Sequence, residues 1–264
     1  IRHLSVPGRA PGRQVKARLT AGKPGRYRYG VRVPAQEEEL TPANNSRTVV
    51  VDVVPDKPTV VVIAGAPSQE YAFAKRALLS DEGLRVRLYV RKRPPDEFWR
   101  DDDQRLEKAP LHSVNLDQTQ AVVLLDVPLP ALGGLTDRLI GFVERGGGLG
   151  VAGEALYEGG YSRSKLARIL PVSLQGASLA DEAFRPRWPE GLGELGEALR
   201  SAGLRPAEMP PWRRRVAAAK TTPGAEVVLR AGDAPVLVAG RAGQGRVAVL
   251  LTSGTHRWVF SPDA

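Results

Sequence analysis

The chain has 264 residues, of which 42% are hydrophobic and 25% charged, a composition typical of a soluble globular protein with one large domain or two ordinary ones. It contains no cysteine, which excludes disulfides, thiol nucleophiles and thiolate metal sites. Its three histidines, His3, His112 and His256, are far apart and lack ligand spacing, so we expect neither a metal site nor a cofactor.

Basic residues outnumber acidic ones by 38 to 29, for a net charge of +9, and they are scattered along the chain. The tightest runs are RVRLYVRKR at 85–93, where strand-like alternation could make one face basic, and WRRR at 212–215. No recognition motif accompanies this charge, so we do not expect nucleic acid to be the partner. A basic protein that binds nucleic acid or anionic lipid remains an alternative.

The sequence shows no apolar run near the roughly 20 residues that cross a bilayer, and no signal-peptide pattern opens it. The opening IRHLSVPGRAPGRQ is typical of the interior of a longer chain. We therefore expect a piece of a larger protein, whose membrane attachment would lie in other segments.

Residues 1–55 are predicted to be β structure. QVKARLT (14–20) and YRYGVRV (27–33) alternate apolar and polar residues, and RTVVVDVV (47–54) is rich in β-branched residues. Three strands make a thin sheet, so we expect them to pack on further strands or on the next domain. PDKP at 55–58 is predicted to be a linker, because its prolines stiffen the chain.

The pattern of residues 58–264 is that of an α/β domain. Apolar runs suited to strands buried on both faces alternate with amphipathic stretches suited to crossover helices, which predicts a parallel sheet. The predicted strands are 59–67, 84–91, 121–128 and 149–153, and the predicted helices are 68–83, with Ser68 as N-cap and Gly83 at the end, and 133–148.

Two parts of this domain depart from the alternation. Residues 92–118 are a polar stretch. Residues 173–224 are predicted to be an excursion from the core, with one helix near 191–203 between proline-rich loops. After the excursion, three short strands joined by glycine-rich turns are predicted to form a meander at 225–254.

Ligands of α/β sheets gather at the carboxyl ends of the strands, so the residues that follow the predicted strands are site candidates. Asp126 and Glu154 are the carboxylates expected to converge there, as a general base or a metal ligand. The alternative, which we favour, is that each caps a helix or a turn. Ser68 and Glu70 carry the same ambiguity, although helix capping alone explains Ser68.

The exit of the strand at 149–153 has the shape of a nucleophile elbow, but its residues are Ala152, Gly153 and Glu154. His256, in LLTSGTHRWVF, could serve as a general base, but we favour a surface-loop residue beside Trp258. An alanine cannot attack a carbonyl, so no catalytic residue is predicted. The main rival is a hydrolase for a sugar or an ester that uses Asp126, Glu154 or His256 in the same cleft.

Four segments together resemble the class I glutamine amidotransferase-like domains of large bacterial membrane proteins. They are TVVVIAGAPSQEYAFAKRALLSDEGLRV, AVVLLDVPLPAL, LIGFVERGGGLGVAGEALYEGGYSRSKLARILPV and PVLVAGRAGQGRVAVLLTSGTHRW, in which GGYSRSKLARILPV and GQGRV are most specific. The resemblance implies a flavodoxin-like three-layer α/β sandwich at 58–264, preceded by an immunoglobulin-like β segment at 1–55. It covers nearly the whole chain except 92–118 and 173–224.

In that superfamily a cysteine stands at the elbow, with a histidine and a glutamate downstream. Aligning LGVAG on the elbow strand places Ala152 at or beside the nucleophile position and His256 near the base, while the following glutamate is missing. The resemblance thus implies the fold and argues against glutamine hydrolysis. We expect a non-catalytic binding or scaffolding domain of a membrane-anchored cell-envelope protein. Its partners would be proteins or other domains of the parent chain, such as a von Willebrand factor A domain.

Overall fold

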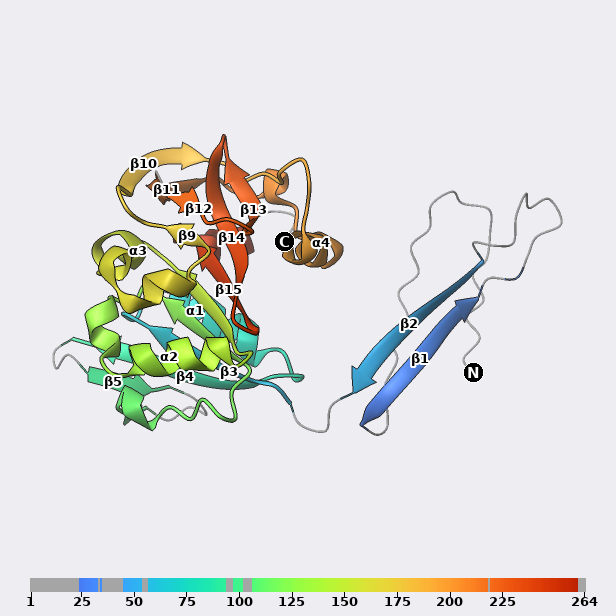
Figure 1. Cartoon of the computed structure of the whole chain (residues 1–264), viewed down its shortest axis with the longest axis horizontal. Coiled ribbons are helices and arrows are strands. Elements are labelled where there is room, and N and C mark those ends of the chain that lie inside the picture. Colours follow the sequence, from blue (N-terminus) through green and yellow to red (C-terminus); the bar gives the residue numbers. More distant parts are fainter. Residues whose placement is uncertain are drawn as a thin grey trace. The chain divides into compact units, whose positions relative to one another are not determined.

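The computed structural model divides into two units, Ile1–Lys57 and Pro58–Ala264, which are drawn in Figure 1. The strand predicted at 14–20 and the first half of the linker predicted at 55–58 lie outside the described residues. None of the helices in the described ranges has both the length and the apolar character that crossing a bilayer requires. The structure describes residues 24–32, 34, 45–53, 57–93, 97–101, 106–217 and 219–260.

The described part of the first unit is an antiparallel pair of strands, β1 (Gly25–Arg32) and β2 (Ser46–Val53). Both strands lie within two residues of the bounds predicted from the alternation at 27–33 and from the β-branched residues at 47–54. The register pairs Tyr27 with Val51, so these two side chains share one face of the ribbon. Two strands do not define a sandwich, and the immunoglobulin-like character of 1–55 stays a prediction.

Among the described residues, the second unit is built on a nine-stranded sheet with the order β13-β14-β15-β8-β7-β3-β4-β5-β6. Strands β15, β8, β7, β3 and β4 are parallel, and antiparallel strands extend the sheet at both sides. The strand bounds are β3 Thr59–Ala64, β4 Arg85–Lys92, β5 Glu97–Arg100, β6 Glu107–Lys108, β7 Ala121–Leu125, β8 Gly148–Ala152, β13 Glu226–Ala231, β14 Ala234–Ala242 and β15 Gly245–Leu250.

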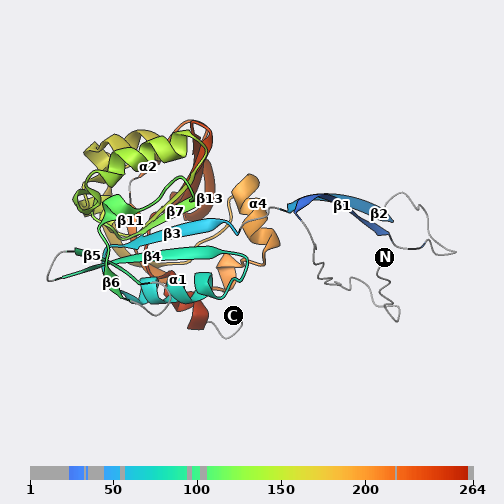
Figure 2. The ribbon, with the colours of Figure 1, turned by 90° about the horizontal axis from the view of Figure 1, so that it is seen from below.

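The two longest helices, α1 (Gln69–Leu79) and α2 (Leu135–Glu144), lie on opposite faces of this sheet, as Figure 2 shows. Leu139 and Val143 of α2 are fully buried in the larger apolar cluster, and Tyr71 of α1 belongs to the cluster on the other face. Burial on both faces explains why the central strands are continuous apolar runs. The unit is therefore a mixed α/β fold with a large mixed sheet and few helices.

The first helix begins where it is predicted but ends earlier. Ser68 is its N-cap, as predicted, and its hydroxyl accepts the N–H of Tyr71 at 3.1 Å. The helix stops at Leu79, however, with Ser80 rather than Gly83 as its C-cap. The helical spacing places Leu79 on the buried face, but it is 48% exposed, whereas the preceding Leu78 packs against the apolar cluster of this face.

The polar stretch at 92–118 and the excursion at 173–224 contain strands that the sequence analysis missed. The first supplies β5 and β6 of the large sheet. The second supplies an antiparallel ribbon of β10 (Ser178–Phe184) and β11 (Trp212–Ala217), in addition to the expected helix. Charged or polar residues interrupt or flank the apolar residues of all four strands, so none of them carries a long apolar run. The other elements there are α4 (Glu194–Ser201), η6 (Pro206–Glu208), and the paired strands β9 (Val172–Ser173) and β12 (Lys220–Thr221).

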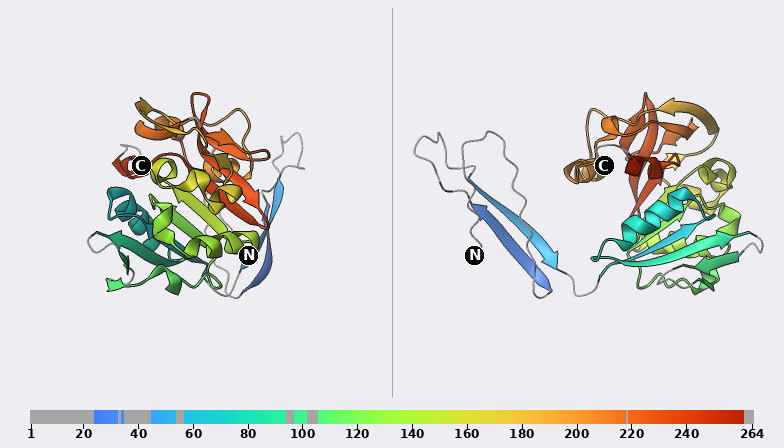
Figure 3. Two further views of the ribbon diagram at one scale, coloured as in Figure 1. Left: turned by 60° about the vertical axis from the view of Figure 1, so that its left-hand side comes forward. Right: turned by 180° about the vertical axis from the view of Figure 1, so that it is seen from behind.

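The β10–β11 ribbon packs beside the β13–β14 end of the large sheet (Figure 3). Trp212 of β11 is fully buried there against Val228 and Val236. This contact places β11 next to the ends of the parallel strands. Short helices complete the described unit: α3 (Ala155–Glu158), η2 (Leu111–Ser113), η3 (Leu129–Leu132), η4 (Tyr161–Arg163), η5 (Lys165–Ile169) and η7 (Thr255–Phe260).

Three neighbouring parallel strands end in close backbone contact. The ladder continues one residue past each strand, since Gly65 N–H donates to the Leu125 carbonyl at 2.9 Å and Asp126 N–H to the Ala152 carbonyl at 2.7 Å. A Cβ at Gly65 would overlap the carbonyl oxygen of Asp126, and one at Gly153 would lie 2.7 Å from its Oδ1. Glycine is therefore required on both sides of Asp126.

Substitution of Gly65 by alanine tests this packing. We expect Gly65→Ala to lower the free energy of unfolding by about 1–3 kcal/mol, because the added methyl group displaces backbone rather than a flexible side chain. Gly134→Ala is the control, because a methyl group added there would have no other atom within 4 Å and the φ of Gly134 is −64°. Urea denaturation of the full chain, followed by tryptophan fluorescence, measures both. Equal midpoints for the two variants would contradict the close contact.

Candidate functional site

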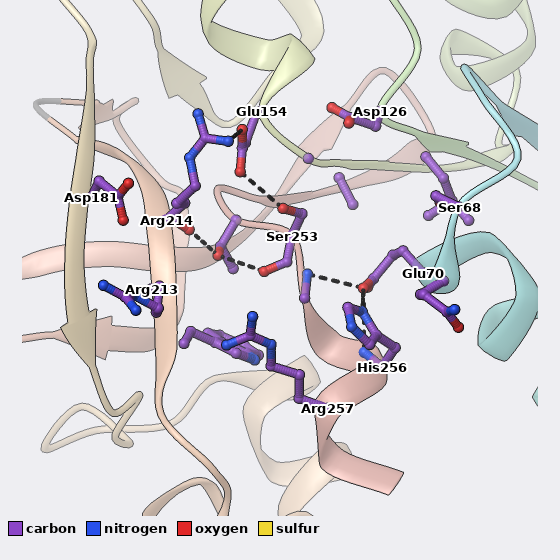
Figure 4. Close-up of a pocket in the computed structure, with 17 residues that line it drawn as sticks. Ser68, Glu70, Asp126, Glu154, Asp181, Arg213, Arg214, Ser253, His256 and Arg257 are labelled. Carbon is purple, nitrogen blue, oxygen red and sulfur yellow. Dashed lines mark hydrogen bonds and ion pairs between the residues drawn. The ribbon is translucent and has the colours of Figure 1, made fainter. Parts of the chain in front are cut away.

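A pocket of about 570 Å³ lies at the carboxyl ends of β3, β7 and β8. Figure 4 shows side chains of both charges around it. Residues that the sequence analysis selected as candidates converge here, as the position of ligands in α/β sheets predicts. The selected residues that line it are Ser68, Glu70, Asp126, Ala152, Gly153, Glu154 and His256.

The elbow after β8 is formed, and it carries no nucleophile. Ala152 ends the strand, Gly153 turns the chain at φ +111°, and Glu154 is the residue before α3. Both Ala152 and Gly153 line the pocket. A methyl group at position 152 can bound a ligand but cannot attack one.

Asp126 is engaged in capping, as the favoured interpretation holds. Its Oδ1 accepts the N–H of Ala155 at 2.7 Å, at the start of α3. It is also the only described non-glycine residue with a positive φ, +51°, a conformation that aspartate tolerates better than most residues. Burial, and secondarily the charge of Asp126, raises the pKa of the Tyr161 phenol, which stays protonated and donates to the Val127 carbonyl at 2.9 Å. Asp126 therefore fixes the elbow.

Glu154 departs from the capping interpretation. It occupies the N-cap position of α3 without a side-chain capping bond. Instead its carboxylate pairs with Arg214 on β11 at 2.8 Å and accepts from the Ser253 hydroxyl at 3.1 Å (Figure 4). Its side chain is 22% exposed, so these bonds are partly shielded from water. Glu154 thus ties the elbow to two elements that are distant in the sequence.

The favoured interpretation of His256 as a surface-loop residue is wrong, because His256 lies half-buried in η7. Its side chain is 23% exposed, its ring stacks on Phe73 with centroids 6.1 Å apart, and Nδ1 lies 3.0 Å from Oε2 of Glu70. The side chain of Trp258, its expected neighbour, lies outside the described part of the chain. The carboxylate beside His256 is that of Glu70, which lies 186 positions before His256 in the chain.

Glu70 anchors the whole turn that leads into η7. Its carboxylate accepts the N–H groups of Gly254, Thr255 and His256 at 2.9, 3.2 and 3.2 Å, and the hydroxyl of Thr255. Four donors on one carboxylate hold the loop against the start of α1, where a negative charge is favourable. Glu70 and the residues that donate to it are more than 180 positions apart in the chain, so local sequence patterns cannot predict these bonds.

A basic wall on the side of β11 was also missed. Arg213, Arg214 and Arg257 line the pocket, as does Asp181 of β10. Arg214 is paired with Glu154, whereas Arg213 and Arg257 have no ion pair with any residue that the structure describes. The sequence shows the run WRRR at 212–215 as a basic cluster. Its position over the ends of the parallel strands depends on the burial of Trp212, which no local pattern reveals.

The structure offers no metal centre within its described ranges. No three histidine, aspartate or glutamate side chains there gather in an arrangement that would hold an ion. His112 lies in η2, outside the pocket, and His3 lies outside the described residues.

No protein-family model and no curated protein matches the chain. A cytoplasmic protein of Salmonella typhimurium LT2 is structurally similar over 76% of this chain and 90% of its own, with a TM-score of 0.56 and 13% identity. A second cytoplasmic protein of Salmonella typhimurium is similar over 90% of this chain and 92% of its own, with a TM-score of 0.50 and 14% identity. A putative ThuA-like protein of Bacteroides uniformis is similar over 79% of this chain and 88% of its own, with a TM-score of 0.47 and 10% identity. The two Salmonella structures show the fold alone.

Substitution of Glu70 by glutamine tests the anchor. We expect Glu70→Gln to cost about 1–3 kcal/mol of stability, because an amide NH₂ would then face backbone donors. Amide hydrogen exchange at 254–256 should become faster. Glu82→Gln, at an exposed position without a described partner, is the matched control. Unchanged exchange at 254–256 in the Glu70 variant would show that the loop is held by other contacts.

Proposed function

We propose that residues 58–264 form a non-catalytic binding domain of the class I glutamine amidotransferase-like, flavodoxin-like type. The observation that carries the proposal is the elbow at the mouth of the pocket, with Ala152 in the place of an attacking group. The sequence resemblance and the parallel strand order β15-β8-β7-β3-β4 support this fold type.

The charges of the pocket support binding rather than bond cleavage. Three carboxylates of the pocket already have partners. Asp126 accepts a backbone N–H group, Glu154 pairs with an arginine, and Glu70 contacts backbone N–H groups and a histidine. The cations without a described partner are Arg213 and Arg257. Guanidinium groups suit carboxylates, because both are planar and can form paired hydrogen bonds. The ligand class that fits is a small molecule with a carboxylate.

We further propose that this domain serves a larger membrane-anchored protein of the cell envelope. The resemblance to domains of bacterial membrane proteins supports this context, with a von Willebrand factor A domain as one partner. The β1–β2 ribbon that precedes the domain is compatible with the immunoglobulin-like segment of such proteins. Anchoring would depend on segments outside this sequence.

Binding can be tested with L-glutamate, which has the size of glutamine and two carboxylates. We expect saturable shifts of the amides of Gly153, Gly254 and His256 in nitrogen-15-labelled full chain. An Arg213→Gln/Arg257→Gln variant should weaken binding by about tenfold or more, the loss expected for charge-assisted hydrogen bonds. Arg145→Gln/Arg163→Gln removes the same charge outside the pocket and should bind normally. Absence of saturable shifts, or equal weakening by both variants, would refute the carboxylate site.

A hydrolase is the second candidate, and the Glu70–His256 contact favours it. If Nδ1–H donates to Glu70, Nε2 is left as an acceptor that could take a proton from water. The absence of a nucleophile at Ala152 does not prevent such a water-mediated reaction.

Two turnover assays separate the candidates. The first assay measures ammonia release from glutamine, and under the binding proposal the wild type releases none. The second measures hydrolysis of p-nitrophenyl acetate. Under the same proposal the wild type, His256→Gln and His112→Gln all show the same background rate. A hydrolase that uses His256 should instead lose about 100-fold or more in rate in His256→Gln. His112→Gln is the control because His112 is exposed outside the pocket. Such a loss, or ammonia release by the wild type, would overturn the non-catalytic assignment.

A further inference from the structure

A second pocket, of about 710 Å³, lies at the β13 edge of the large sheet. Glu226, Val227 and Arg230 of β13 line it, together with Asp233 of the turn that follows this strand. The other wall is the segment 187–191, which follows β10 and precedes α4. No residue lines both this pocket and the candidate functional site, so the two are separate. We call it the edge pocket.

Backbone hydrogen bonds hold the walls of the edge pocket together. The N–H of Arg187 donates to the Arg230 carbonyl at 2.8 Å, and the N–H of Arg230 donates to the Arg187 carbonyl at 2.9 Å. The Arg187 guanidinium also donates to the Gly232 carbonyl at 3.2 Å. On β13, the Glu226 carboxylate accepts the N–H of Gly196 in α4 at 2.9 Å. These bonds join β13 to α4 and to the segment before it, so the pocket is preformed.

Trp188 supplies an aromatic surface to the edge pocket. Its side chain is half-buried, because it packs on the apolar cluster that includes Trp212 and Val228 while it also lines the pocket. An indole that is already packed loses little side-chain entropy when a ligand contacts it. Pro189 and Gly191 beside it carry no polar side-chain group. The pocket therefore has one apolar side.

Three charged side chains of the edge pocket have no partner among the described residues. The carboxylates of Glu190 and Asp233 are exposed and form no hydrogen bond or ion pair there. The side chain of Arg230 forms none either. Its Nε is buried without an acceptor, whereas its terminal nitrogens are not buried and can donate to a ligand. The pocket thus offers both acceptors and donors that the fold itself does not use.

The charges of the edge pocket nearly balance. The unpaired carboxylates of Glu190 and Asp233 are matched by the guanidinium groups of Arg187 and Arg230. The third carboxylate, of Glu226, is occupied by N–H groups at the start of α4, where the helix dipole favours a negative charge. Balanced charge gives no strong preference for an anion or a cation. It favours a neutral ligand whose groups both donate and accept, as hydroxyl groups do.

We propose that the edge pocket binds a neutral sugar. A pyranose ring carries hydroxyl groups on its rim and C–H groups on its faces. The hydroxyl groups can bond to Glu190, Asp233 and Arg230 while one face packs on Trp188. The pocket volume lies within the range of small-molecule sites, roughly 300–1,000 Å³. This site is independent of the proposed carboxylate pocket and does not rely on its function.

The test is NMR titration of the nitrogen-15-labelled full chain with the methyl glycosides of glucose, galactose, mannose and N-acetylglucosamine. We expect at least one glycoside to shift the indole N–H signal of Trp188 saturably, and the signal missing from Trp188→Phe identifies it. Glu190→Gln/Asp233→Asn should weaken this binding about tenfold or more, the loss expected for hydrogen bonds to charged groups. Glu82→Gln/Asp117→Asn removes the same charge at exposed positions outside the pocket and should bind normally.

The fold of the carboxylate variant has its own check. Glu190 and Asp233 are exposed and unpaired within the described ranges, so Glu190→Gln/Asp233→Asn should unfold at the urea midpoint of the wild type. With an unchanged midpoint, weaker glycoside binding reports the loss of contacts to the ligand rather than misfolding.

Three results would overturn this proposal. They are a Trp188 signal that none of the glycosides shifts, equal weakening by both double variants, and shifts confined to amides of the candidate functional site, such as Gly153 and Gly254. N-acetyl-arginine amide provides a cationic arm. If this compound shifts the Trp188 signal and the glycosides do not, the edge pocket recognises basic side chains of a peptide rather than a sugar.

Discussion

The architecture of the α/β unit depends on the close approach of its parallel strands where they end. Gly65 and Gly153 flank the backbone of Asp126 so closely that neither position has room for a side chain. This contact holds β3, β7 and β8 in register at one edge of the sheet, and it turns the chain sharply into α3. The ends of these strands beside the pocket are therefore fixed by backbone contacts, which side-chain rotation cannot change.

Three of the carboxylates that line the pocket stabilise the fold around it. Asp126 holds the start of α3, Glu70 holds the turn before η7, and Glu154 joins the elbow to β11 through Arg214. Each of these carboxylates is therefore already bonded to groups of the protein itself.

The β10–β11 ribbon gives the pocket its particular electrostatic character. Without it, the strand ends would present mostly acidic side chains from α1, β7 and β8. Burial of Trp212 against the β13–β14 hairpin brings Arg213 and Arg214 over this acidic surface. A segment that packs on one end of the sheet thus determines the charge of a pocket built on another part of it.

The sequence by itself determined the central strands, α1 and α2, because two-sided burial and helical spacing leave strong local patterns. It also determined that position 152 has no nucleophile, and that Ser68 caps α1. Only the tertiary structure decided the pairing of His256 with Glu70, the bond of Glu154 to Arg214, and the existence of β10 and β11. The two side-chain contacts join residues far apart in the chain, and in β10 and β11 charged residues interrupt the apolar ones. Neither feature leaves a clear periodic signal within a window of sequence.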